Sequence, residues 1–208
     1  MKVLVFGAHP DDMEVGMGGT IARHSSFGDE VLMCVATVPS QGERRRNEAR
    51  RGAEILGARL HVLDIPPDEL EYNRHTVRRV DEILSDFDPD TIYTQWDQDS
   101  HQDHNSISRS VISAARKNRC SLLMYEQTIP GGIVPGGFRD QCFVDISSYI
   151  DRKIESIRAH ESQWEIHGDR WLQGLRGRAS YRGFQMNVEY AEAFEVIKEI
   201  DAPFRHRR

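Results

Sequence analysis

Short apolar stretches alternate with amphipathic stretches along the first 128 residues of the chain. The apolar stretches are bounded by turn residues and predict buried β-strands. The stretches between them repeat apolar residues at helical spacing and predict α-helices. The expected strands are residues 2–7, 31–38, 60–65, 91–95 and 122–127, and the expected helices are residues 16–27, 43–56, 72–87 and 103–117. Because this alternation favours a parallel sheet covered on both faces, we expect a Rossmann-like, doubly wound α/β fold with a mostly parallel sheet and a C-terminal cap.

The last third of the chain breaks this alternation. Two glycine pairs and two prolines predict a loop over residues 130–137, either a wall or lid over a site or a plain surface loop. A strand near residues 142–146 and helices near residues 147–164 and 188–200 are expected to follow.

The composition is typical of a soluble globular domain. Apolar residues make up 38% of the chain and charged residues 29%, which is the profile of neither a membrane protein nor a disordered chain. At this length folding buries roughly 70% of the unfolded surface, so stability requires no disulfide or structural metal. We expect one domain over residues 1–208, with a core at about 1–128 and a cap with completing elements at about 129–202.

Charge and cysteine content limit the partners and the compartment. With 27 basic and 33 acidic residues the net charge is −6, which argues against a general nucleic-acid binder. No stretch approaches the roughly 18 apolar residues of a membrane span. The three cysteines, Cys34, Cys120 and Cys142, are far apart and form no CxxC pair, as is typical of reduced thiols. We therefore expect a cytoplasmic protein without a membrane span or a nucleic-acid partner.

A first polar cluster, His9-Pro10-Asp11-Asp12, directly follows the first expected strand. In open α/β sheets, sites form at the carboxyl ends of strands, where a dinucleotide-binding enzyme carries its glycine turn. Gly16, Gly18 and Gly19 come later, inside the expected helix, and they are expected to permit close helix–sheet packing rather than to bind a dinucleotide. Taken alone, the cluster is also compatible with a turn followed by a helix N-cap.

A second polar cluster, residues 97–104, follows the fourth expected strand. In the strand order of a doubly wound sheet, the first and fourth strands are neighbours, so the two clusters should face one crevice. Taken alone, the second cluster is compatible with a polar helix start. Together, two such clusters at neighbouring strand ends indicate a shared site.

The residue types in this crevice suit a catalytic metal. His9, Asp12 and His104 are the expected ligands of Zn²⁺, with a fourth position left open, and this ligand set also accepts Fe²⁺ or Co²⁺. Asp11 is adjacent to a ligand and is expected to act as the general base on metal-activated water.

His101 lies three residues before His104 and should face the same crevice. We expect it to donate a hydrogen bond to a developing oxyanion or to protonate a leaving amine. Asp103 is expected to hold its other nitrogen and to raise the pKa of the imidazole. The remaining internal histidines are expected to be surface or satisfied core residues: His24, His61, His75, His160 and His167.

Both clusters also carry a family resemblance. Ala8-His9-Pro10-Asp11-Asp12 and His101-Gln102-Asp103-His104 resemble the paired signatures of the LmbE-like (PIG-L) zinc N-deacetylases. The extended start, residues 8–20, is similar to the bacillithiol-pathway branch. Similarity continues at Arg45, Glu48 and Leu56-Gly57, and again at Tyr181-Arg182-Gly183 and Tyr190-Ala191-Glu192-Ala193-Phe194, so it covers nearly the whole chain.

Two positions depart from the family pattern. Met13 stands where the family frequently has glutamate. Asp99 stands where the mycothiol-type enzymes have a tyrosine, so no tyrosine hydroxyl is expected at the oxyanion.

The resemblance implies an enzyme that removes an acyl group, usually acetyl, from the 2-amino nitrogen of a glucosamine-containing small molecule. It implies the same zinc ligands, the same base and the same second histidine as the residue chemistry suggests. It further implies that Arg45 contacts the sugar or its aglycone and that homo-oligomers are common.

Two alternatives stay open from the sequence. The same metal centre could act on a non-sugar amide or on an antibiotic or surface-glycan intermediate. Alternatively, the crevice could belong to a non-catalytic sugar- or nucleotide-binding module with a structural metal. A closed four-ligand site favours the module, whereas three ligands and an open position favour catalysis.

Overall fold

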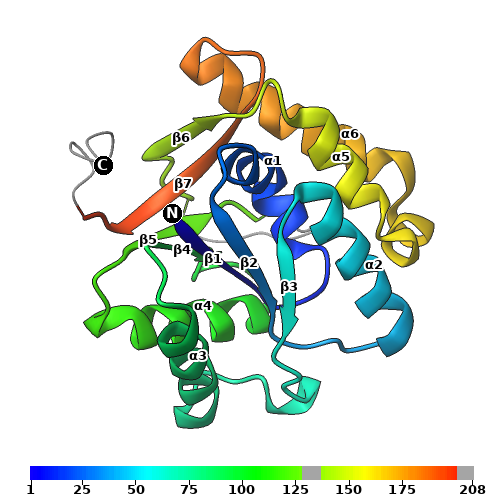
Figure 1. Ribbon diagram of the computed structural model, residues 1–208. Helices are drawn as coiled ribbons and strands as arrows, with labels where there is room; N and C mark the ends of the chain where they lie inside the picture. Colours follow the sequence, from blue (N-terminus) through cyan, green and yellow to red (C-terminus); the bar gives the residue numbers. More distant parts are fainter. Residues whose placement is uncertain (128–136, 201–208) are drawn as a thin grey trace.

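The computed structural model describes residues 1–127 and 137–200, and it contains a seven-stranded sheet in the order β3-β2-β1-β4-β5-β7-β6 (Figure 1). The strands are β1 Lys2–Gly7, β2 Glu30–Val35, β3 Arg59–Val62, β4 Thr91–Gln95, β5 Ser121–Tyr125, β6 Cys142–Asp145 and β7 Ala191–Lys198. Strands β1 to β5 pair in parallel, and β7 pairs antiparallel with both β5 and β6. The mostly parallel α/β sheet expected from the sequence is confirmed. Most of the predicted 130–137 loop lies outside the described residues.

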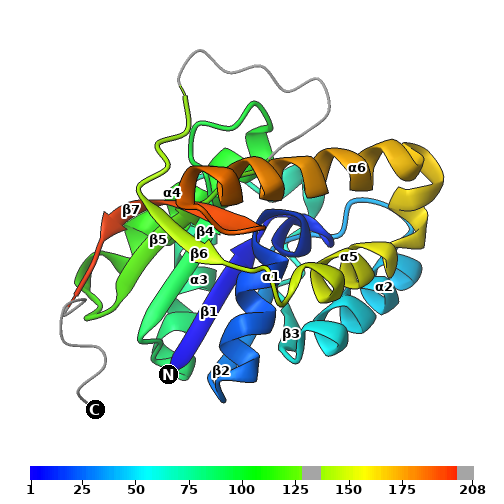
Figure 2. The same cartoon turned by 90° about the horizontal axis from the view of Figure 1, so that it is seen from above.

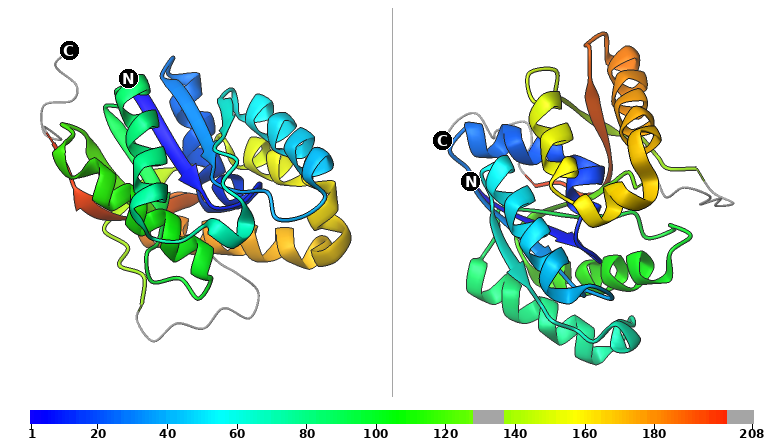
Figure 3. Two further views of the ribbon diagram at one scale, coloured as in Figure 1. Left: turned by 90° about the horizontal axis from the view of Figure 1, so that it is seen from below. Right: turned by 90° about the vertical axis from the view of Figure 1, so that its right-hand side faces the viewer.

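Helices cover both faces of the sheet (Figure 3). They are α1 Asp12–Ser26, α2 Gly42–Leu56, α3 Arg74–Phe87, α4 Gln102–Ala114, α5 Ile150–Arg158 and α6 Glu161–Met186, with short 3₁₀ turns at Pro67–Glu69 and Ala115–Lys117. Side chains of β1 alternate between the two cores, as the period of two in a strand requires. Leu4 and Phe6 pack with α3 and α4, whereas Val3 and Val5 pack with α1 and α2. No described helix is both long and apolar enough to cross a membrane.

The glycines of α1 allow close packing, as predicted. A Cβ atom on Gly16 would lie 2.2 Å from the ring of Tyr125 on β5, and one on Gly19 would lie 2.7 Å from Ile146. Only glycine therefore lets α1 approach the sheet and the segment after β6 this closely.

The expected helix over residues 188–200 is wrong, because this segment contains strand β7. Alanine and glutamate favour a helix locally, but β7 lies between two strands and pairs with both. Its buried acidic residues are satisfied by partners from elsewhere: Glu192 pairs with Lys153, and Glu195 pairs with Arg139. Tertiary pairing thus overrides the local preference.

The expected helix over residues 147–164 is instead two helices, α5 and the start of α6, which runs alongside β7 (Figure 2). Helix α6 is broken at Gly168, whose φ of 60° and ψ of −162° lie in a region that essentially only glycine adopts. The break redirects the chain between the two parts of α6.

We predict opposite effects for alanine at two glycines of α6. Gly168→Ala should lower the free energy of unfolding by about 1–3 kcal/mol, because a Cβ makes this backbone conformation strained although no atom lies within 4 Å of it. Gly174→Ala is the matched control, since Gly174 is exposed within the helix and also has open space around it. This control should raise stability by up to about 1 kcal/mol. Urea unfolding measures the free energy of unfolding of both variants. Equal effects would show that the backbone conformation at Gly168 does not require glycine.

Candidate metal centre and active site

The structure brings the two polar clusters together at the carboxyl ends of β1 and β4, which are neighbouring parallel strands. A hydrogen bond ties the two strand ends, because the backbone N–H of Ala8 donates to Oε1 of Gln95 over 2.8 Å. Beyond this bond the chain leaves β1 through His9 and enters α1, while the segment after β4 leads into α4. The convergence therefore follows from strand adjacency.

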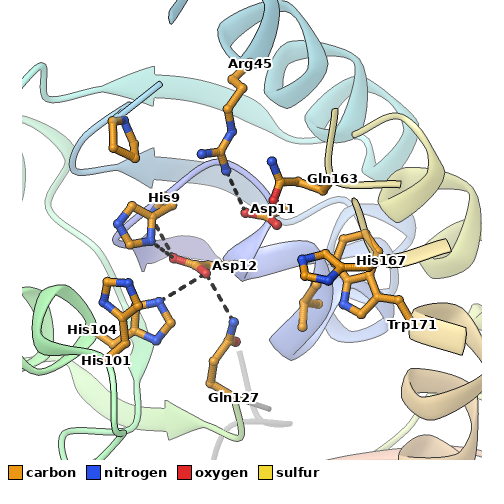
Figure 4. A pocket seen from close by; sticks show the side chains of 12 residues that line it. His9, Asp11, Asp12, Arg45, His101, His104, Gln127, Gln163, His167 and Trp171 are labelled. Carbon is orange, nitrogen blue, oxygen red and sulfur yellow. Dashed lines mark hydrogen bonds and ion pairs between the residues drawn. The ribbon is translucent and has the colours of Figure 1, made fainter. Parts of the chain in front are cut away.

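The Asp12 carboxylate lies at the centre of the site, between two imidazoles (Figure 4). Its Oδ2 atom accepts a hydrogen bond from the backbone N–H of His9 and lies 3.6 Å from His9 Nδ1. Its Oδ1 atom lies 3.4 Å from His104 Nε2 and accepts a hydrogen bond from Gln127. One ligand atom from each of His9, Asp12 and His104 lies within 4.8 Å of the others, and all three residues are buried. These three residues could hold a divalent metal ion, and two imidazoles with one carboxylate are donors that such ions accept.

Each of these imidazoles has a second carboxylate on its far nitrogen. Asp103 Oδ2 lies 2.9 Å from His9 Nε2, and Asp99 Oδ2 lies 3.2 Å from His104 Nδ1. Such partners fix the tautomer of a ligand histidine and leave its other nitrogen free for a metal. The acidic spacing of the second cluster carried the signal for Asp99, which we did not assign to the site from the sequence.

The expected contact between the Asp103 carboxylate and His101 is wrong, because that carboxylate bonds to His9 instead. Only the backbone N–H of Asp103 reaches His101, donating to Nδ1 over 3.2 Å at the N-terminus of α4. Since Nδ1 accepts, the proton of neutral His101 lies on Nε2.

The expectation that His101 is cationic is also wrong. Its ring stacks on His104 with a centroid distance of 4.6 Å and lies 4.9 Å from His9. Burial and the charges of these two imidazoles lower the pKa of His101 below its ordinary value, against a weaker opposing effect of Asp103. At neutral pH the side chain is a neutral hydrogen-bond donor.

The pKa values of His9, His104 and Asp12 are all shifted toward the charged forms of these side chains. Burial by itself lowers the pKa of His9, but its bonds to Asp103 and Asp12 outweigh burial and raise it to about 9. Burial also lowers the pKa of His104, but the charge of Asp12 and the hydrogen bonds to Asp12 and Asp99 together outweigh burial and raise it to about 10. Burial opposes ionisation of Asp12, yet the two imidazoles hold its pKa well below the usual range. The ionised carboxylate is therefore the stable form of Asp12.

Asp11 behaves in the opposite way from its neighbour. Burial and the charge of Asp12 raise the pKa of Asp11 to about 7, although His160 and Arg45 act against the shift. Its backbone is held at a positive φ of 97°, which turns the Asp11 carboxylate away from Asp12 and toward Arg45, as Figure 4 shows. Nη2 of Arg45 lies 3.2 Å from Asp11 Oδ1 and donates to the carbonyl of Pro10. A carboxylate with a pKa near neutrality is suited to exchange protons.

A cavity of about 310 Å³ opens beside these groups. Besides the two clusters and Arg45, it is lined by Val15, Pro39, Gln127, Gln163, His167 and Trp171. Gln163 and His167 lie four residues apart on the first part of α6, a spacing that could have revealed a shared helix face, whereas Trp171 follows the break at Gly168. His167 was expected to be a surface or satisfied core residue, but it lines this cavity. His160 is a core residue as expected, but it is only partly satisfied: its Nε2 bonds to Glu14, whereas its buried Nδ1 has no hydrogen-bond partner in the described part of the chain.

With this geometry established, the chain can be compared with known proteins. Residues 4–115, more than half of the chain, match the PIG-L family, which is described as GlcNAc-PI de-N-acetylase. The chain belongs to this family. It is 30% identical to a diacetylchitobiose deacetylase of Thermococcus kodakarensis over 99% of this chain and 87% of that protein. The family resemblance of the sequence is thereby confirmed.

Two further similarities concern the fold and the reactions of related proteins. A crystal structure of a conserved protein from Thermus thermophilus superposes with a TM-score of 0.84 at 25% identity and covers 95% of both chains. A 4-oxalmesaconate hydratase of Pseudomonas putida is 24% identical over 94% of this chain and 89% of its own. Because a deacetylase and a hydratase are both relatives, the reaction has to be argued from the site.

The raised pKa values of His9 and His104 predict proton release on metal binding. Both imidazoles are protonated near neutral pH in the metal-free protein, and a metal displaces a proton from each. Calorimetric Zn²⁺ titrations in buffers of different ionisation enthalpy should show release of about two protons, with affinity rising from about pH 6.5 to about pH 8.5. A pH-independent affinity would contradict this ligand set.

The same pKa shifts predict that the stability of the metal-free protein falls as pH rises, whereas metal affinity increases. Because the folded-state pKa values are raised, this stabilisation is fully present below the ordinary value of 6.5 and is lost as pH rises toward about 9 and 10. Thermal unfolding of the metal-free protein across this range provides the internal control for the titration.

Proposed function

We propose that this protein is a metal-dependent hydrolase that removes an N-acetyl group from a small molecule containing N-acetylglucosamine. The observation that carries the proposal is the pairing of a buried His9–Asp12–His104 set with the adjacent Asp11, whose pKa is raised to about 7. Ligands for a hydrolytic metal and a base poised near neutrality thus face one cavity. Family membership supports amide hydrolysis over hydration.

Zn²⁺ is the metal we favour, because two imidazoles and one carboxylate with an open position form a typical catalytic zinc site, although Fe²⁺ and Co²⁺ suit the same donors. When bound, such a cation lowers the pKa of a water ligand and polarises the amide carbonyl. Asp103 and Asp99 would hold the two imidazoles in orientation.

Asp11 and His101 divide the remaining chemistry. Asp11 takes a proton from the attacking water through its free carboxylate oxygen, while Arg45 holds the other oxygen in place. His101 donates its Nε2 proton as a hydrogen bond to the oxygen of the former carbonyl and stays neutral throughout. The C–N bond then breaks, and the proton held by Asp11 passes to the departing amine. Acetate and a free 2-amino group are the products, and Asp11 returns to its ionised form.

The cavity supports an amino-sugar conjugate as substrate. Its lining offers hydrogen-bonding groups for sugar hydroxyls at Gln127, Gln163 and His167, and the aromatic face of Trp171 for the apolar face of a pyranose. Arg45 is largely committed to Asp11 and Pro10, so we assign it to positioning the base as well as to contact with the sugar. Free, buried thiols at Cys34 and Cys120 support the cytoplasm as the compartment, and we propose a homo-oligomer as the working form.

The deciding experiment is an acetate-release assay. The metal-loaded protein should release acetate from N-acetylglucosamine or diacetylchitobiose and release much less from a non-sugar acetamide. Activity on the acetamide alone would overturn the amino-sugar assignment. No acetate from any of them, with metal bound, would overturn the deacetylase proposal.

We predict that His104→Ala abolishes metal binding and activity together. The change removes one of three protein ligands, so the purified variant should contain far less zinc by elemental analysis. His75→Ala is the matched control, because His75 is exposed on α3 away from the cavity. Full zinc content with unchanged affinity in His104→Ala would show that the ligand set is wrong.

Asp11→Asn should keep the metal and lose turnover by about 10²–10⁴-fold, the range of a positioned acid–base group. Asparagine tolerates the positive φ at this position, so the backbone should stay intact. Asp86→Asn on the exposed face of α3 controls for the loss of a carboxylate. Near-native turnover with metal retained, or loss of metal, would each contradict the role of Asp11.

A further inference from the structure

Helix α1 is interrupted one turn after the metal ligand Asp12. Met17 has non-helical φ and ψ values of −146° and 28°, which divide the helix into a front part with Asp12 and Val15 and a rear part that begins at Gly18. In an unbroken helix the N–H of Gly19 would donate to the carbonyl of Val15. The break at Met17 lies between these two residues, and both are buried.

One buried ion pair satisfies both of the separated groups. The Val15 carbonyl accepts a hydrogen bond from Nζ of Lys153 over 2.9 Å. The Gly19 N–H donates to Oε1 of Glu192 over 3.1 Å, and the Thr20 N–H donates to Oε2 over 2.7 Å. Lys153 and Glu192 are themselves paired, so one buried ion pair bonds to backbone groups on both sides of the break in the helix.

Burying the two charges of this ion pair costs desolvation free energy. Lys153 is 1% exposed and Glu192 is 4% exposed. Apolar residues of similar volume frequently replace buried ion pairs without loss of stability. This pair differs from such cases, because an apolar replacement of Glu192 would leave the buried N–H groups of Gly19 and Thr20 without their acceptor. A Cβ atom on Gly18 would lie 3.2 Å from the Lys153 side chain, which shows how closely the lysine approaches the helix.

The ion pair connects α5 and β7 to α1, the helix that carries the proposed metal ligand Asp12. The front part of α1 begins with an ordinary helical hydrogen bond, in which the Val15 N–H donates to the Asp11 carbonyl over 2.9 Å. It is held at its end by Lys153 of α5 and by Arg178 of α6, both of which donate to the Val15 carbonyl. Asp12 lies within the turn that ends at this attached carbonyl, and Val15 lines the cavity.

We propose that Lys153 and Glu192 are positioning residues that set metal affinity by fixing the front part of α1, and with it the Asp12 carboxylate. The proposal rests on the ligand assignment of the proposed function. It explains why a buried lysine and a buried glutamate from two distant parts of the chain meet at the break of this helix. Neither residue lines the cavity described above.

The test is a Zn²⁺ titration of the metal-free protein with a competing chromophoric chelator. Lys153→Met/Glu192→Met removes the pair while keeping the volume filled, and the Kd for Zn²⁺ should weaken by roughly 10- to 100-fold, as for residues that orient metal ligands. The matched control is Arg59→Met/Glu30→Met, which removes an exposed ion pair between neighbouring strands. Thermal unfolding shows that each variant is folded at the titration temperature.

A folded double variant with wild-type Zn²⁺ affinity overturns the positioning role. If the double variant does not fold, Glu192→Gln replaces it, because glutamine still accepts from one backbone N–H and should weaken Zn²⁺ binding several-fold. Unchanged affinity in that variant also overturns the role. Wild-type protein that binds no Zn²⁺ overturns the metal centre itself, so the two failures are distinguishable.

Discussion

The Asp12 carboxylate between the imidazoles of His9 and His104 is the interaction on which the site depends. Both of its oxygens are engaged, one toward each histidine, in a region with almost no solvent contact. Such an arrangement holds only if each partner is oriented by something else. Adjacent parallel strands bring the histidines together, Asp103 and Asp99 orient their rings, and a short piece of α1 supplies the carboxylate.

Two neighbouring carboxylates acquire opposite properties from this arrangement. Asp12 faces two imidazoles that favour its charge, so its pKa falls well below the ordinary range. Asp11 turns the other way, is largely buried and lies near the charge of Asp12, so its pKa rises to about 7. Environments that push a pair of titratable groups apart are the usual means by which one site provides both a fixed charge and a proton acceptor. Here the two side chains point to different partners, Asp11 to Arg45 and Asp12 to the two imidazoles.

The C-terminal third completes what the N-terminal part begins. Helix α6 supplies Gln163, His167 and Trp171 as one wall of the cavity, and its break at Gly168 falls between the last two. Helix α5 and strand β7 supply the ion pair that bonds to α1. The family match over residues 4–115 therefore contains the proposed ligands and base. The α6 wall of the cavity and the ion pair that bonds to α1 lie outside this match.

The sequence by itself determined the alternation of strands and helices, the two polar clusters and their meeting at one sheet edge, because these depend on short-range periodicity and on strand adjacency. It also sufficed to propose His9, Asp12 and His104 as ligands. Only the tertiary structure decided that residues 191–198 form a strand, that Asp103 serves His9 rather than His101, and that His101 is neutral. It likewise decided that Lys153 and Glu192 meet at the break in α1. These features depend on contacts between residues far apart in the chain, whose charges and hydrogen bonds outweigh local preference and leave no periodic trace in the sequence.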